Sequence, residues 1–94
     1  MEKLYVLVDE TLPLVHQGVQ GGHALAQWLL ENPQQQWNNR TLVYLKADIK
    51  REIQKLLYKG IEYTAFHEPD RNNELTAVAL QCEDKYVKHL KLMC

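Results

Sequence analysis

Apolar residues gather in four short runs that alternate with amphipathic or polar stretches. The runs cover residues 4–8, 41–46, 61–66 and 75–80, and each is bounded by charged residues or by residues that favour turns. Runs of this length, rich in leucine, valine and tyrosine, predict β-strands. The first and the last run are nearly all apolar, which is typical of strands that are covered on both faces of a sheet.

The stretches between these runs predict three helices, at about 18–31, between Asp48 and Gly60, and at about 83–92. The second has the clearest boundaries, because Asp48 is a good N-cap and Gly60 suits a left-handed position after the last turn. The third begins with acidic and ends with basic residues, as the helix dipole favours. In the first, Gly21 and Gly22 each destabilise a helix by roughly 1 kcal/mol relative to alanine, so we expect a strand or a ligand to lie close there.

The resulting order β-α-β-α-β-β-α predicts an α/β domain with a four-stranded mixed sheet. Two β-α-β units imply parallel pairing with right-handed crossovers. The short turn before the last run makes strand 4 antiparallel to its neighbour. Helices on both faces then form a three-layer α/β/α sandwich. The chain of 94 residues is long enough for a single domain, so we expect one domain over residues 1–94.

Charge and cysteine content exclude several classes of protein. The net charge of -1 provides no overall field that gathers nucleic acid, so contact with phosphates requires a local patch. The outer face of the second helix is such a patch, with Lys50, Arg51, Lys55 and Lys59. Cys82 and Cys94 form neither a disulfide framework nor a metal-binding spacing, which suits a reducing compartment. With no signal peptide and no membrane-spanning run in the sequence, we expect a cytoplasmic protein.

Four polar side chains recur on one side of the first helix. His16, Gln20, His23 and Gln27 are spaced by four, three and four residues, which returns them to one helical face. The connection that leads into this helix lies at the carboxyl edge of the sheet, where ligands of open α/β folds bind. Helix N-terminal N–H groups, expected near Gly18, bind phosphates or a developing oxyanion.

The carboxyl end of the third strand delivers further polar groups to the same edge. His67, Glu68 and Asp70 lie in the turn, and Thr76 begins the next strand. Together with His16, they supply a base, a hydroxyl and N–H donors, which are the groups of a hydrolase that activates water.

Each of these residues also has an interpretation without function. His16 is then a solvated loop residue, His23 packs with a hydrogen-bonded ring, and Gln20 and Gln27 lie on the surface. Acidic residues are common in turns, and threonine favours strands on its own account. A metal site from His16, His23 and an acid is disfavoured, because histidines seven residues apart lack a third ligand in register.

Taken in order, these motifs resemble those of the type II peptidyl-tRNA hydrolases. The first motif is the run His16-Gln17-Gly18-Val19-Gln20-Gly21-Gly22-His23-Ala24. The second is the turn His67-Glu68-Pro69-Asp70 followed by Thr76-Ala77-Val78-Ala79, and the tail His89-Leu90-Lys91-Leu92-Met93 is similar to the end of the family's last helix. The resemblance spans nearly the whole chain.

The resemblance implies an esterase that cleaves the bond between a peptide and the ribose of tRNA without a metal or other cofactor. It places His16, Glu68 and Thr76 in catalysis, with Glu68 in the position of the family's aspartate and Thr76 in that of its strand threonine. Substrate binding is then expected from Gln20, His23, His67 and Asp70. His16 activates water or stabilises the oxyanion, and Glu68 orients it. The implied partners are tRNA or peptidyl-tRNA and a second copy of the chain, with no membrane.

A second function stays open at this point. His16 stands where the family has its catalytic lysine, and His67 stands where it has an arginine. An imidazole is a weaker phosphate or oxyanion clamp than a permanent ammonium. The alternative is therefore a catalytically degenerate module with the same fold that binds tRNA, a nucleotide or a protein.

Overall fold

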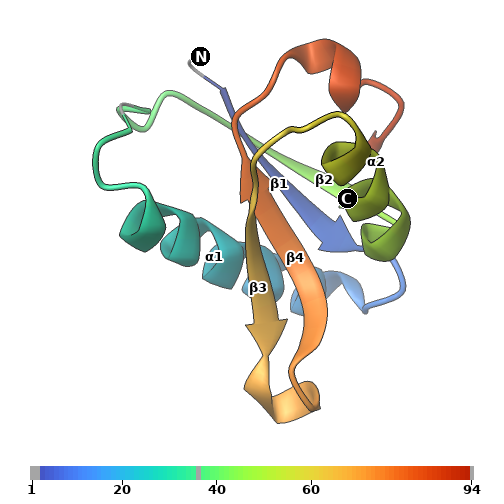
Figure 1. The fold of residues 1–94 in the computed structure, drawn as a ribbon. Coiled ribbons are helices and arrows are strands. Elements are labelled where there is room, and N and C mark those ends of the chain that lie inside the picture. Colours follow the sequence, from blue (N-terminus) through green and yellow to red (C-terminus); the bar gives the residue numbers. More distant parts are fainter. Residues whose placement is uncertain (1–2, 36, 94) are drawn as a thin grey trace.

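The computed structural model describes residues 3–35 and 37–93, which form an α/β domain (Figure 1). Its helices and strands are, in chain order, β1 (Lys3–Asp9), α1 (Leu14–Glu31), β2 (Thr41–Ala47), α2 (Ile49–Tyr58), β3 (Thr64–Glu68), β4 (Glu74–Leu80) and β5 (Lys91–Leu92). Two short 3-10 turns, η1 (Pro69–Arg71) and η2 (Asp84–Tyr86), precede and follow β4. Met1, Glu2, Gln36 and Cys94 lie outside the described residues. The structure therefore does not bear on what the sequence analysis expects of the first two residues and of the Cys94 thiol.

The strands form one mixed sheet in the order β3-β4-β1-β2-β5. β1 and β2 are parallel neighbours, in register from Lys3 opposite Thr41 to Asp9 opposite Ala47, as expected for a β-α-β unit. β4 pairs antiparallel with both β1 and β3, in agreement with the short turn that joins β3 to β4. β3 is therefore an edge strand, at the far side of the sheet from β2.

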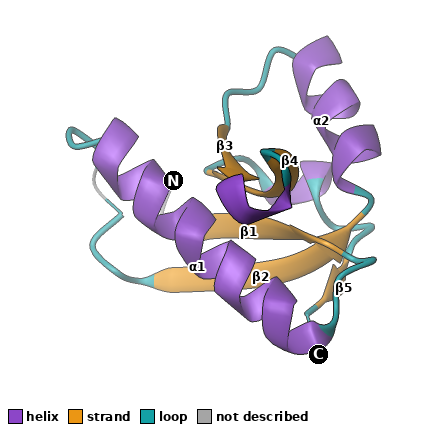
Figure 2. Cartoon of the chain, turned by 90° about the horizontal axis from the view of Figure 1, so that it is seen from below, coloured by secondary structure: helices purple, strands orange, loops and turns teal. Residues whose placement is uncertain are grey.

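The alternation of side chains in β1 divides the core into two clusters. Leu4, Val6 and Val8 point to the face covered by α1, which contributes Ala24 and Trp28. Tyr5 and Leu7 belong to the cluster on the other face, which is completed by α2 and by Cys82 and Val87 of the C-terminal segment. Figure 2 shows the two helices on opposite sides of the strands. Cys82 is a buried free thiol.

Gly21 allows α1 to lie very close to the sheet. A Cβ atom at Gly21 would come within 2.5 Å of Tyr44 Cε2 and 3.0 Å of Val8 Cγ1. A Cβ atom at Gly22 would meet nothing within 4 Å. The expected close approach of a strand therefore applies to Gly21 and not to Gly22.

The boundaries predicted for α2 are confirmed. The Asp48 side chain accepts a hydrogen bond from the backbone N–H of Arg51 at 3.4 Å, which caps the first turn. Gly60 has a φ of 68°, the left-handed conformation that glycine adopts most easily. Ile49 and Leu56, which are seven residues apart and therefore lie on one helical face, are buried in the core.

The predicted four-stranded sheet, three helices and three-layer α/β/α sandwich are wrong. The sheet has five strands, and the segment expected as a helix over 83–92 contains η2 and the short strand β5. Long-range contacts explain the difference, because Asp84 accepts hydrogen bonds from Lys3, at 3.0 Å, and from the Tyr5 hydroxyl. The chain then returns to the free edge of β2, where β5 pairs antiparallel. The layer opposite α1 therefore holds one short helix and a non-helical segment.

Two further boundaries differ from the expectations. α1 begins at Leu14 rather than near Gly18, because Pro13, with a φ of -55°, leads directly into the helix. β3 begins at Thr64 rather than at residue 61. Neither helix in the described part of the chain is long and apolar enough to cross a membrane.

Candidate functional site

A β-bulge in β4 determines where Thr76 points. Phe66 pairs with Ala77 and His67 pairs with Leu75, so Thr76 is the extra residue between the two pairs. Leu75 packs on the α2 side of the sheet and Ala77 on the α1 side. A regular strand would alternate, and would turn Thr76 away from α1. The bulge turns it toward α1, as bulges beside functional sites often re-aim a side chain.

Thr76 starts a chain of hydrogen bonds that joins three elements. Its hydroxyl donates to Gln20 Oε1 at 2.6 Å, and Gln20 Nε2 donates to Glu68 Oε1 at 3.2 Å. α1, β3 and β4 thus meet at these side chains, which come from both motifs identified in the sequence. No described residue donates a hydrogen bond to Glu68 Oε2, so this oxygen can accept a proton or a ligand.

Burial separates these side chains by role. Thr76 is fully buried and Gln20 is nearly so, whereas Glu68 is half-buried. A group without access to solvent cannot contact a substrate in this conformation. Thr76 and Gln20 therefore act as positioning residues that fix the orientation of Glu68. The carboxylate of Glu68 is the member of the chain that a ligand can reach.

His16 lies on the same side of α1, but among the described residues no hydrogen bond or ion pair joins it to Glu68. It is exposed in the first turn of the helix, one turn and roughly 6 Å along the axis from Gln20. No hydrogen bond joins His16 to Glu68 in the described structure, so Glu68 does not orient the imidazole as expected. Because α1 begins at Leu14, the unpaired helical N–H groups belong to residues 14–16 rather than to the neighbourhood of Gly18.

The remaining predicted residues do not take part in the hydrogen-bond chain. The His23 ring stacks on Phe66, with centroids 4.6 Å apart and planes 9° from parallel, so it helps to hold β3 against α1. His67 is exposed on β3, and Asp70 is exposed in η1. Neither is joined to Glu68 by a hydrogen bond in the parts of the chain described.

Two neighbouring residues were not singled out from the sequence. Phe66 packs against the core cluster under α1. The sequence could have indicated it, because an aromatic residue two positions before Glu68 lies on the same face of a strand. Gln17 is buried, and its Nε2 donates to the backbone oxygen of Leu12 at 2.7 Å. Its Oε1 atom is buried without a partner among the described residues. This side chain anchors the loop that leads into α1.

A basic groove lies on the other face of the sheet, between α2 and the C-terminal segment. It brings together two of the four basic residues predicted on the second helix, Lys55 and Lys59, with Lys85 and Lys88 of the C-terminal segment. Lys50 and Arg51, the other two members of the predicted patch, do not line it. Lys59 and Lys85 lie over the ring of Tyr86, at 5.6 and 5.2 Å from its centroid. The acidic neighbour Glu83 raises the pKa of Lys85, which favours the charged form. At the floor of the groove, buried Glu52 pairs with His89 at 2.8 Å.

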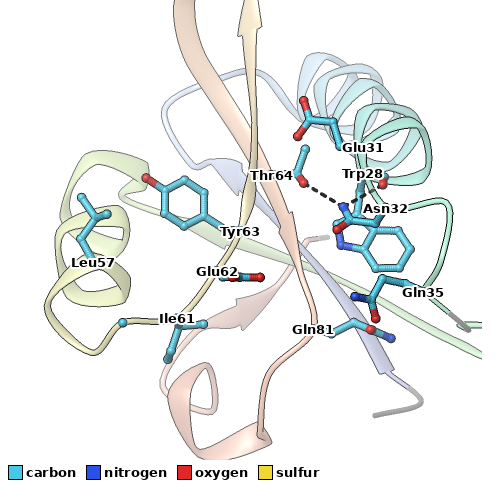
Figure 3. A pocket seen from close by; sticks show the side chains of 11 residues that line it. Trp28, Glu31, Asn32, Gln35, Leu57, Ile61, Glu62, Tyr63, Thr64 and Gln81 are labelled. Atoms are coloured by element: carbon cyan, nitrogen blue, oxygen red, sulfur yellow. Dashed lines mark hydrogen bonds between the residues drawn. The ribbon is translucent and has the colours of Figure 1, made fainter.

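A second hollow opens at the opposite end of β3 from Glu68. Figure 3 shows it between the end of α1, residues 60–64 and Gln81. Within it, the Asn32 amide donates to the Trp28 carbonyl oxygen at 2.9 Å and to the Thr64 hydroxyl at 3.3 Å. These contacts cap α1 and hold the first residue of β3, so the polar groups here have structural partners. None of the predicted site residues lines this hollow.

Metal chemistry finds no support in the side-chain arrangement. Within residues 3–35 and 37–93, no three histidine, cysteine, aspartate or glutamate side chains are clustered as a ligand set. Zinc and similar ions need three or four such ligands at bonding distance.

Comparisons with known proteins support the fold alone. No protein-family model and no curated protein sequence matches the chain. Among solved structures, the chain is similar to the protein of unknown function Atu0240 from Agrobacterium tumefaciens strain C58, with a TM-score of 0.72 and 14% sequence identity. The match covers 98% of this chain and 97% of the other. The fold therefore extends over nearly the whole length of both chains.

Proposed function

We propose that this domain is a peptidyl-tRNA hydrolase-like esterase that acts in the cytoplasm on the ester between a peptide and tRNA. One observation carries the proposal, the chain of hydrogen bonds from Thr76 through Gln20 to Glu68. It joins the two motifs on which the resemblance rests, across 48 and 56 residues of sequence. It also leaves a carboxylate oxygen of Glu68 available to a ligand.

Glu68 is the general base in this mechanism. Its Oε2 atom takes a proton from water, and the hydroxide formed attacks the carbonyl carbon of the ester. The carbonyl oxygen becomes an oxyanion, which the free N–H groups at the start of α1 and the His16 ring stabilise. When the bond between this carbon and the ribose oxygen breaks, the proton passes from Glu68 to the ribose oxygen. Gln20 and Thr76 keep Glu68 in place during both steps.

The basic groove between α2 and Lys88 is the proposed contact for tRNA phosphates. It lies on the face of the sheet opposite α1, so the phosphates that it binds are distant from the ester. The domain measures 31 × 26 × 25 Å, and a long polynucleotide can contact both faces at once. Binding through lysines to phosphates weakens as salt increases, because counterions are released.

The direct test is the release of peptide from purified peptidyl-tRNA. Glu68→Gln keeps the shape of the side chain but removes the base, so we expect activity to fall about 100-fold or more. Glu74→Gln is the matched control, because Glu74 pairs with Glu68 across the strands but is exposed and bridges Arg71 at 3.7 Å. Absence of peptide release at every pH and at saturating substrate would refute the esterase proposal.

The position of His16 favours a second candidate, a catalytically degenerate module that binds tRNA. An exposed imidazole that has no hydrogen bond to Glu68 among the described residues provides neither an oriented base nor a permanent charge. The two candidates predict different results at this residue. Activity that appears only in His16→Lys supports the degenerate module, whereas activity in the native protein that His16→Ala abolishes supports the esterase.

A further inference from the structure

β3 leaves one edge of the sheet open. Among the described strands it pairs with β4 alone, and it is the outermost strand of the sheet (Figure 1). In an antiparallel pair, the N–H and C=O groups of alternate residues point away from the partner, so part of the backbone of Thr64–Glu68 faces outward. Proteins usually protect such an edge with lysine or proline, and this strand contains neither. The edge is therefore able to pair with a further extended chain.

The polar side of α1 runs along this open edge. Gln20 donates a hydrogen bond to Glu68, the last residue of β3. One turn further on, the His23 ring stacks on Phe66, and Gln27 follows after another turn on the same helical face. His23 is exposed and Gln27 is half-buried. Because an added strand lies about 4.8 Å beyond β3, it would pass beside these two side chains.

The two ends of the edge differ, which gives an added chain a direction. Glu68, the general base of the proposed reaction, ends β3, so the ester that it hydrolyses lies at this end. The hollow in Figure 3 lies at the other end, where residues 60–64 line it. Glu31 and Glu62 also line this hollow, and their negative charge suits the positive amino terminus of a peptide. A peptide esterified at its carboxyl end therefore runs parallel to β3.

From the open edge, the polar side chains beside it and the base at its end, we infer that β3 binds an extended peptide as an added strand. In the reaction this is the peptide part of the substrate, an assignment that rests on the proposed function. Main-chain hydrogen bonds provide the recognition, so peptides of many sequences bind, but proline is disfavoured wherever an N–H group must face β3.

The length of the edge determines how much of a peptide it binds. An extended chain advances about 3.3 Å per residue, like the strand beside it, so a peptide of the same length as β3, which has 5 residues, covers the edge. The residues before these then lie beside residues 61–63 and enter the hollow. Release of peptide from peptidyl-tRNA should therefore become faster as the peptide grows, and should level off at about eight residues.

Peptide binding is measured by nuclear magnetic resonance without hydrolysis, so that it does not depend on the esterase reaction. The probe is a peptide amide of about eight alternating threonine and alanine residues. It should shift the backbone amide signals of Thr64–Glu68 and of His23 more than those of Lys91–Leu92, which form the strand at the other edge of the sheet. A nitroxide at the carboxyl end of the probe should broaden the signal of Glu68 more than that of Ile61, and a nitroxide at the amino end should do the reverse.

N-methylation of the probe distinguishes strand pairing from other contacts. Alternate residues of an added strand direct their N–H groups to β3 and to solvent. Two probes, methylated at the odd or at the even positions, should therefore differ in affinity by about tenfold or more. In the protein, Gln27→Trp should obstruct the edge and lower the affinity by about tenfold. Gln54→Trp is the matched control, because Gln54 is an exposed glutamine on α2, and this variant should bind like the native protein.

Several outcomes would overturn the inference. Equal affinities of the two methylated probes would do so, as would equal affinities of Gln27→Trp and Gln54→Trp for the unmodified probe. Shifts at β3 that grow with protein concentration alone would assign the edge to a second copy of the chain instead.

The measurements also separate this inference from the esterase proposal. Binding of the probe to β3, with no release of peptide from peptidyl-tRNA, would contradict the esterase and leave the peptide site standing. Release of peptide, with no binding of the probe to β3, would contradict the peptide site and leave the esterase standing.

Discussion

Gly21 and Gly22 form a matched pair that tests how closely α1 lies on the sheet. An alanine at Gly21 brings its methyl group within 2.5 Å of the Tyr44 ring and 3.0 Å of fully buried Val8. An alanine at Gly22 meets no atom within 4 Å. The two substitutions are chemically identical and lie in the same helix, so their difference isolates the effect of the contact.

The expected magnitudes follow from opposing contributions. In both variants alanine favours the helix over glycine by roughly 0.5–1 kcal/mol. At Gly21, overpacking in a close-packed core costs about 1–3 kcal/mol and exceeds this gain. We therefore expect Gly22→Ala to raise the free energy of unfolding by up to about 1 kcal/mol and Gly21→Ala to lower it by about 1 kcal/mol or more. A difference of about 2 kcal/mol separates the melting temperatures by roughly 10 °C in a domain of this size.

Urea unfolding followed by tryptophan fluorescence measures this difference. Trp28 and Trp37 both lie in the core cluster under α1, so their emission reports on the packing concerned. Both variants and the native chain should be compared at the same low protein concentration. If both variants change the free energy of unfolding by the same amount, α1 does not approach Tyr44 as closely as described, and the reasoning fails.

Four further predictions concern one buried hydrogen bond and three groups whose pKa is shifted in the folded domain. Thr76→Val leaves Gln20 Oε1 buried without its donor and should lower the free energy of unfolding by about 1–3 kcal/mol in urea. Burial and the hydrogen bond to Asp84 raise the pKa of Tyr5 above its ordinary value of 10.0. The stability that the protonated Tyr5 contributes should therefore be lost as the pH rises above 10.0. In unfolding titrations, Tyr5→Phe should remove this alkaline dependence. The hydrogen bonds from Tyr5 and Lys3 lower the pKa of Asp84, so the free energy of unfolding should fall as the pH drops through the acid range. In the Asp84→Asn variant this fall should be less steep. Burial raises the pKa of Cys82 to about 11, so iodoacetamide at pH 9 should alkylate it only on unfolding, as peptide mass spectrometry would show.

The sequence predicted correctly those elements whose structure is determined by residues close together in the chain. The cap at Asp48 and the left-handed Gly60 define α2 without help from distant contacts. The apolar runs that form β1 and β4 were identified to within about two residues, as is usual for strand ends. The need for close approach at Gly21 was also visible, because a glycine inside a helix requires a reason.

Distant contacts determine the regions where the predictions failed. The sequence around Asp84 and Lys88 has the charge order of a helix, but Asp84 binds Lys3 and Tyr5, which are about eighty residues earlier in the chain. The free edge of β2 offers backbone hydrogen bonds to Lys91 and Leu92, which local propensity does not register. The segment expected as a third helix therefore contains a fifth strand, β5, and no α-helix.

The candidate site was predictable in its members but not in its geometry. Gln20, Glu68 and Thr76 were all named from the sequence, and their side chains meet. Their division into a reachable carboxylate and two buried positioning groups depends on burial, which spacing does not determine. The hydrogen bond expected between Glu68 and His16 is absent from the described residues, and Gln20 is the residue on α1 that binds the carboxylate.

The extra residue in β4 has a consequence for aligning this chain with other sequences. Leu75 faces the α2 side of the sheet, whereas Thr76 and Ala77 both face the α1 side. In a relative whose strand lacks this extra residue, the threonine that faces α1 would stand one position away from Thr76 in a sequence alignment. Deleting any one residue from 75 to 77 would shift the strand into regular phase. Such a deletion would change which side chain Gln20 meets, although the composition of the strand would hardly change.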